Sequence, residues 1–123
     1  MNPARCTFTV SLSRQMGSTD AETGKRVMAW QTVVAAMPCV PPATLGPKAR
    51  ELLLSQVEQA EYQLSWTPFP DSLWAEGVDP EDRHVKSGDR VSFRGRTYTI
   101  AMLRDDSFRP TGPYWTAILS EKV

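Results

Sequence analysis

The residues that could carry acid–base chemistry are few in this chain. His84 is the only histidine, and it sits between Arg83 and Val85 in a charged stretch. A catalytic triad would need a nucleophile and an acid placed around it, and no nucleophile-elbow motif occurs in the sequence. We therefore interpret His84 as a solvated loop residue and predict no enzyme activity.

Residues for metal or phosphate binding are also lacking. Two separated cysteines, Cys6 and Cys39, and one histidine do not make a four-ligand zinc site. The acidic run 79–82 lacks the spaced ligands and turn glycine of a calcium loop, and no glycine loop is followed by Lys-Ser/Thr. We predict no cofactor, and we expect both cysteines to be free thiols in apolar strands.

Aromatic and charged residues point to protein contacts. Trp30, Trp66 and Trp115 fall in predicted strands, where tryptophan usually belongs to the core, whereas Phe69 and Trp74 fall in a long acidic segment. Acidic surroundings oppose contact with phosphates, so we expect these two rings to contact protein or to pack against the body.

The charges are evenly balanced but unevenly distributed. Fourteen basic residues match fourteen acidic ones, yet residues 51–82 carry eight acidic residues and no basic one, whereas residues 83–96 carry five basic residues and one acidic one. The two segments either neutralise each other on one subunit or face each other across the boundary of a head-to-tail ring. On the second interpretation the interface charges are Glu58, Glu61, Arg90, Arg94 and Arg96.

A β-hairpin over residues 88–100 is the clearest structural element. Val91, Phe93, Tyr98 and Ile100 alternate with polar residues, which predicts two strands with one buried face. We place the turn at Gly95-Arg96 as type II′, which sets Phe93 opposite Tyr98, in preference to a turn at Arg94-Gly95.

The remaining elements are strands, one helix and two long polar segments. Strands are predicted over Cys6–Ser13, Val27–Met37, Tyr62–Trp66 and Tyr114–Leu119, and a helix after Gly46-Pro47 carries the apolar stripe Ala49, Leu52, Leu53, Gln56, Val57 and Ala60. The polar run 14–26 is an exposed loop or an extended hairpin tip, and residues 67–87 form a long loop.

Together these elements predict one domain over residues 1–123. It is mostly β: a small antiparallel β-barrel or sandwich of about six strands with one short α-helix and long loops, because closure removes exposed strand edges. The start of the chain does not read as a signal peptide and no apolar run approaches membrane-spanning length. We expect a soluble protein made in a cytosol.

The order of three motifs resembles the head-tail joining proteins of tailed bacteriophages, also called head-completion or stopper proteins. An opening strand and a polar loop with Asp20 and Gly24 precede a strand from Trp30 to Ala36. A helix starting at Arg50-Glu51 then runs into the strand that ends at Trp66. The hairpin completes the pattern with Asp89-Arg90-Val91, Phe93, Gly95-Arg96, Tyr98 and Ile100. The segment 67–87 is longer than the family's usual link.

The resemblance implies a β-barrel subunit of a homo-oligomeric ring in the virion neck, assembled in the bacterial cytoplasm. Its partners would be the portal or adaptor ring and the tail proteins, with transient non-specific contact with genomic DNA and no membrane contact. It would close the portal channel after packaging and dock the tail. Mobile loops 14–26 and 67–87 would meet a ring partner and the channel or tail, through Asp20, Gly24, Lys25, Phe69, Trp74, Asp79, Glu81 and Asp82.

Two alternatives stay open from the sequence. A small OB-like or SH3-like barrel could bind nucleic acid through Arg90, Arg94, Arg96 and nearby aromatic rings, because barrels of several families share such a hairpin. A tail terminator or another neck protein would differ only in the partner that it meets.

Overall fold

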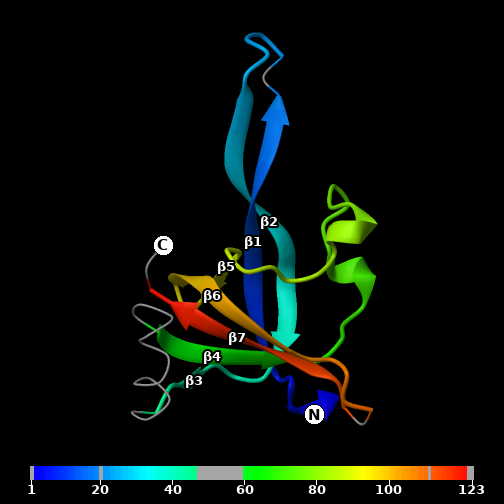
Figure 1. Ribbon diagram of the computed structural model, residues 1–123, viewed down its shortest axis with the longest axis vertical. Helices are drawn as coiled ribbons and strands as arrows, with labels where there is room; N and C mark the ends of the chain where they lie inside the picture. The colour runs from blue at the N-terminus through cyan, green and yellow to red at the C-terminus, as the bar shows by residue number, and fades with distance from the viewer. Residues whose placement is uncertain (1, 20, 47–59, 111, 122–123) are drawn as a thin grey trace.

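The computed structural model describes residues 2–19, 21–46, 60–110 and 112–121, and within them it is mostly β (Figure 1). Seven strands form a single antiparallel sheet in the order β2-β1-β5-β6-β7-β4-β3. The strands are β1 (Phe8–Thr19), β2 (Arg26–Cys39), β3 (Ala43–Thr44), β4 (Ala60–Trp66), β5 (Arg90–Phe93), β6 (Arg96–Asp106) and β7 (Tyr114–Ser120). Short 3-10 turns are η1 (Pro3–Arg5), η2 (Asp71–Leu73) and η3 (Pro80–Asp82).

The mostly β, antiparallel fold class is confirmed, and the sheet is open. The strands at its two ends, β2 and β3, are not paired with each other. One backbone bond still brings the end of β2 toward β4, because Val40 N donates to Ser65 O at 2.8 Å. The described residues form one strand more than the six that were predicted. This additional strand, β3, has only two residues, and an alternation pattern cannot be recognised over so short a segment.

The main core gathers buried side chains from six of the strands and from the segment that precedes β5. The predicted alternation holds where strands cross the body: Val10 and Leu12 of β1 and Leu64 and Trp66 of β4 are buried. Val91, Phe93, Tyr98 and Ile100 of the hairpin are buried as well. Edge-to-face contacts of Phe93 with Phe8 and Tyr62, at ring-centroid distances of 6.1 and 5.9 Å, hold the hairpin on the core.

The predicted register of this hairpin was wrong. Phe93 pairs with Arg96 and Val91 with Tyr98, so the turn is Arg94-Gly95. Both turn residues have positive φ, 51° and 74°, as a type I′ turn requires. Moving the pairing by two residues leaves every side chain on the same face, so alternation could not choose between the registers. Phe93 and Tyr98 still stack, diagonally, at 4.9 Å.

The second strand also differs from its predicted pattern. Period-two spacing puts Met28, Trp30, Thr32, Val34 and Ala36 on one side of this strand, but of these only Val34 is buried, beside Val33. Register shifts near Leu12 interrupt the β1–β2 pairing and change which residues face the core. The predicted helix lies outside the described residues except for Ala60, which begins β4.

Candidate docking surfaces

The β1–β2 hairpin extends far beyond the body as an arm, residues 15–19 and 21–30 (Figure 1). β5 pairs with β1 only from Ser11 to Ser13, whereas the β1–β2 pairing continues to Thr19 and Arg26. Within the described residues the arm is therefore a two-stranded ribbon. Of the two alternatives for the polar run 14–26, the extended hairpin tip is the one observed.

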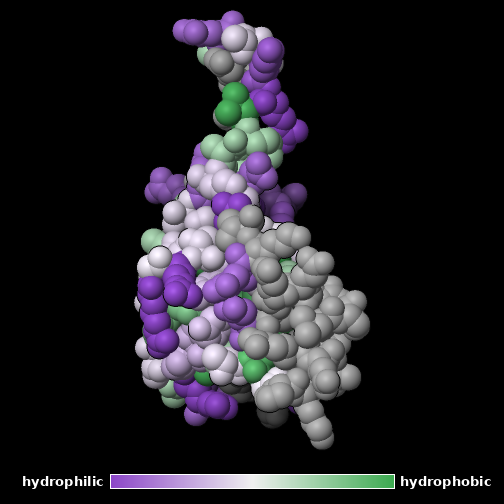
Figure 2. Space-filling view, turned by 90° about the vertical axis from the view of Figure 1, so that its left-hand side faces the viewer, coloured by the Kyte–Doolittle hydropathy of each residue, from purple (hydrophilic) through white to green (hydrophobic). Residues whose placement is uncertain are grey.

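The arm exposes large apolar side chains. Val27 and Met28 are each 47% exposed and Trp30 is 40% exposed, and an apolar patch is visible midway along the arm in Figure 2. Across the ribbon, a Cβ on Gly17 would lie 2.5 Å from Arg26 Nε and 2.9 Å from Met28 Sδ. Glycine thus lets the Arg26 and Met28 side chains lie flat over β1.

The predicted loop residues fall at the tip of the arm. Gly24 adopts φ 69°, and the backbone N–H of Lys25 donates to Thr23 Oγ1 at 3.4 Å. Both residues are exposed. Asp20, which was predicted with them, lies outside the described residues.

Trp30 lies at the base of the arm and not in the core, contrary to its prediction. The Arg90 guanidinium stacks over its ring at 3.7 Å from the centroid, and Arg90 Nε is buried without a hydrogen-bond partner. Period-two alternation predicts the face of the strand on which Trp30 lies. It does not show which part of the strand belongs to the arm and which part to the body.

The segment 67–87 is packed onto the body around Arg14. Arg14 binds Asp89 through Nε–Oδ1 at 2.9 Å and Nη2–Oδ2 at 2.8 Å, and it also donates to the carbonyl oxygens of Asp82 and His84. Farther along, Ala75 N donates to Val33 O at 2.8 Å.

This packing separates the predicted loop residues. Trp74 is 6% exposed and forms part of the core, and Phe69 stacks on it at 6.0 Å. Asp79 and Glu81 are exposed. Asp82 pairs with Lys86 at 2.7 Å, and the hydrogen bond and charge of Lys86 lower the pKa of this carboxyl.

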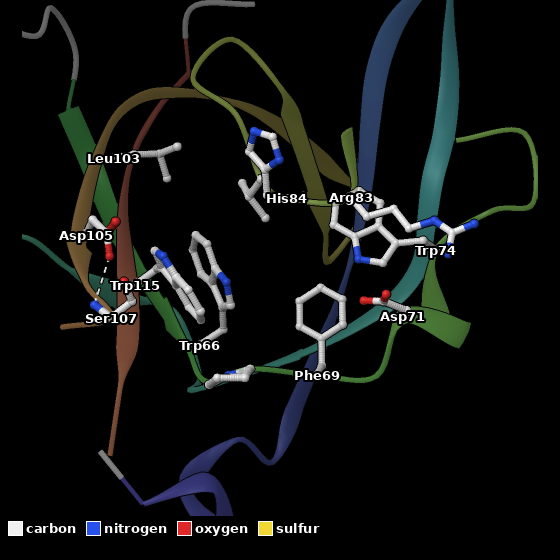
Figure 3. Close-up of a pocket in the computed structure, with 12 residues that line it drawn as sticks. Trp66, Phe69, Asp71, Trp74, Arg83, His84, Leu103, Asp105, Ser107 and Trp115 are labelled. Atoms are coloured by element: carbon white, nitrogen blue, oxygen red, sulfur yellow. Dashed lines mark hydrogen bonds between the residues drawn. The ribbon is translucent and has the colours of Figure 1, made fainter. Parts of the chain in front are cut away.

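An aromatic groove of about 500 Å³ opens between this segment and the ends of β4, β6 and β7 (Figure 3). Trp66 and Trp115 stack in parallel at 6.4 Å and form one wall, and Phe69 and Trp74 form the other. Trp66 is a core residue as predicted, whereas Trp115 is half-buried. The groove is lined by Trp66, Pro68, Phe69, Asp71, Trp74, Arg83, His84, Val85, Leu103, Asp105, Ser107 and Trp115.

Polar side chains also line the groove. The hydroxyl and backbone N–H of Ser107 lower the pKa of Asp105, and the backbone bond measures 2.8 Å. Asp71 and His84 are both exposed. The sequence did not indicate this groove, because its tryptophans come from three separate segments that only the strand order brings together.

The predicted interface arginines all belong to the β5–β6 hairpin, Arg90 in β5, Arg94 in the turn and Arg96 in β6. Arg94 lies over Phe8 at 5.4 Å, and Arg96 pairs with Glu121 at 3.4 Å. Glu61 lies in β4, and Glu58 lies outside the described residues. Two of the three arginines, Arg90 and Arg94, thus lie over aromatic rings of their own subunit.

The potential reactive groups are dispersed. His84 lies on the exposed rim of the groove, and Cys6 Sγ lies 3.5 Å from Thr67 Oγ1. Burial raises the pKa of the Cys39 thiol to about 12. In the described part of the chain, no three acidic, histidine or cysteine side chains form a group that could hold a metal ion, and no described helix is long and apolar enough to cross a membrane.

Comparison with models of known protein families and with curated proteins gives no match for this chain.

Proposed function

We propose that this chain is a structural subunit of the head-tail connector of a tailed bacteriophage. As a head-completion or stopper protein it closes the portal channel after DNA packaging and offers the tail a docking surface. The arm is the observation that carries the proposal. It leaves Val27, Met28 and Trp30 between 40% and 47% exposed, on a two-stranded ribbon that is at best marginally stable alone. A protein partner that covers these side chains would fix the arm.

The charges favour a protein partner over nucleic acid. Acidic and basic residues are equal in number, so the molecule lacks the positive field that draws proteins to phosphates. Arg90 and Arg94 lie over aromatic rings, and Arg96 pairs with a carboxylate. These contacts support a connector over a nucleic-acid-binding barrel.

The proposed place is the virion neck, where copies form a ring after assembly in the bacterial cytoplasm. The partners are the portal or adaptor ring on one side and the tail on the other. Contact with the genome is transient and non-specific, because a channel subunit that held phosphates tightly would impede DNA exit. A tail terminator would use the same surfaces toward a different partner.

The proposal can be tested with tail-less, DNA-filled phage heads that lack this protein. Adding the purified protein should increase both DNA retention and tail joining. The double variant Val27→Asp/Met28→Asp should fail in both, because it places two carboxylates in the covered surface. The control Ala35→Asp/Ala101→Asp changes two exposed strand residues outside the arm and should act like the wild type.

Two results would overturn the proposal. One is unchanged DNA retention and tail joining after addition of the wild-type protein. The other is a protein that does not bind the heads but whose tryptophan fluorescence is quenched by single-stranded DNA, tightly and in a salt-sensitive manner. That result would favour the nucleic-acid-binding barrel.

A further inference from the structure

The arm and the aromatic groove cannot meet within one subunit. The arm leads away from the body, whereas the groove opens beside segment 67–87 at the ends of β4, β6 and β7 (Figures 1 and 3). A contact between them must join two copies through different surfaces. Such head-to-tail contacts close into rings when the rotation between copies permits it.

The strand on the arm is basic and apolar. Lys25 and Arg26 are the only charged residues from position 25 to 32. Immediately after them come Val27 and Met28, which are about half exposed, and then Trp30. An acceptor for this strand must offer both carboxylates and an apolar surface.

The groove and its surroundings offer both. Segment 67–87 carries five acidic residues, Asp71, Glu76, Asp79, Glu81 and Asp82, against two basic ones, Arg83 and Lys86, so its net charge is −3 with His84 neutral. Asp105 adds a carboxylate at the groove itself. Four aromatic rings supply the apolar surface, and sulfur contacts with aromatic rings suit a methionine side chain.

On the basis of the proposed function, we propose that the aromatic groove receives the arm of a second copy of this chain. Val27 and Met28 of one copy lie against the tryptophan rings of the next, and Lys25 and Arg26 face its acidic segment. In this contact the acidic residues of segment 67–87 therefore pair with Lys25 and Arg26 of the neighbouring copy, and not with the basic residues between 83 and 96. Each contact is small, so it is weak between free subunits and gains strength when several copies share one ring.

The four tryptophans allow a direct test in the full-length chain. After Trp30→Phe, the three that remain, Trp66, Trp74 and Trp115, all line the groove. This variant, labelled with ¹⁵N at the indole nitrogens and kept dilute, is titrated with unlabelled wild-type protein. The indole N–H signals should shift progressively, and the shifts should shrink at high salt because opposite charges are then screened.

Matched unlabelled variants show whether the arm causes the shifts. Val27→Asp/Met28→Asp should weaken the titration about tenfold or more, and Ala35→Asp/Ala101→Asp should reproduce the wild type. The proposal is overturned if the wild type leaves the indole signals unmoved at the highest concentration, or if both variants shift them equally.

This titration and the test with heads can fail separately. If the heads bind the wild-type protein but not the arm variant, while the indole signals do not shift, the arm binds a different protein. In that case only the proposed contact between the arm and the groove is wrong. If the indole signals shift but the heads do not bind the protein, the contact between copies is supported and the proposed connector function is wrong.

Discussion

At the scale of single residues, the Arg14–Asp89 pair holds segment 67–87 on the sheet. Side chains of both residues are nearly enclosed, with exposed fractions of 11% and 4%. Their two parallel hydrogen bonds, together with the bonds to the carbonyls of Asp82 and His84, leave the guanidinium well satisfied. The groove keeps its shape because one of its walls is part of this segment.

We predict that Asp89→Ala lowers the free energy of unfolding by about 3–5 kcal/mol, because it leaves the Arg14 guanidinium buried without its carboxylate. Urea denaturation measures the change. The control Arg96→Ala removes an exposed pair with Glu121 and should cost less than about 1 kcal/mol. Equal losses in the two variants would mean that the Arg14–Asp89 pair does not hold the segment.

The Asp82–Lys86 pair predicts a pH dependence. The pKa of Asp82 is lower in the folded protein than its ordinary value, chiefly because it accepts a hydrogen bond from Lys86. The pair therefore stabilises the fold above the unfolded-state pKa, and this contribution is lost as the pH falls through the folded-state pKa. Lys86→Met should raise the pKa of Asp82 toward its ordinary value in a carboxyl NMR titration. An unchanged pKa would show that Lys86 is not the cause.

At the scale of elements, the turn between β5 and β6 depends on backbone conformation. Gly95 has φ 74°, and a Cβ there would meet no atom within 4 Å. Gly95→Ala should therefore cost about 1 kcal/mol through backbone strain alone. Gly77 is equally open and has no positive φ, so Gly77→Ala should be neutral or slightly stabilising. Thermal unfolding measures both, and a neutral Gly95→Ala would contradict the type I′ turn.

Alternation predicted the faces of strands but not their limits. Val10, Leu12, Leu64 and Trp66 are buried as their period-two spacing indicates. The same spacing includes Trp30, where β2 has not yet reached the body, so periodicity alone assigned that ring to the core. The register of the β5–β6 turn could not be predicted from alternation, because a shift of the pairing by two residues leaves every side chain on the same face of the sheet. Contacts in the groove depend on the strand order β6-β7-β4, which no local pattern specifies.

At the scale of the whole molecule, the arm and the body are separable in stability. The core draws on β1, β2, β4, β5, β6, β7 and segment 67–87, and most of the arm contributes nothing to it. We predict that replacing residues 17–28 with an Asn-Gly turn changes the free energy of unfolding by less than about 1 kcal/mol. The same replacement should abolish tail joining. A large loss of stability would show that the arm supports the fold rather than a partner.

Hydrogen exchange gives a second view of this separation. In the free protein, amides of the arm should exchange much faster than those of Leu12 and Val34, because a two-stranded ribbon opens without breaking the core. Uniform protection along β1 and β2 would mean that the arm is already held in the isolated chain.

We propose that this chain forms a ring at the neck of a phage head. Electron microscopy of DNA-filled, portal-bearing heads mixed with the purified protein tests it most directly. We predict a ring of added density at the portal exit, with an arm from each subunit reaching its neighbour. Heads with an unchanged portal exit, together with protein bound only to free DNA, would show that the chain is not a connector subunit.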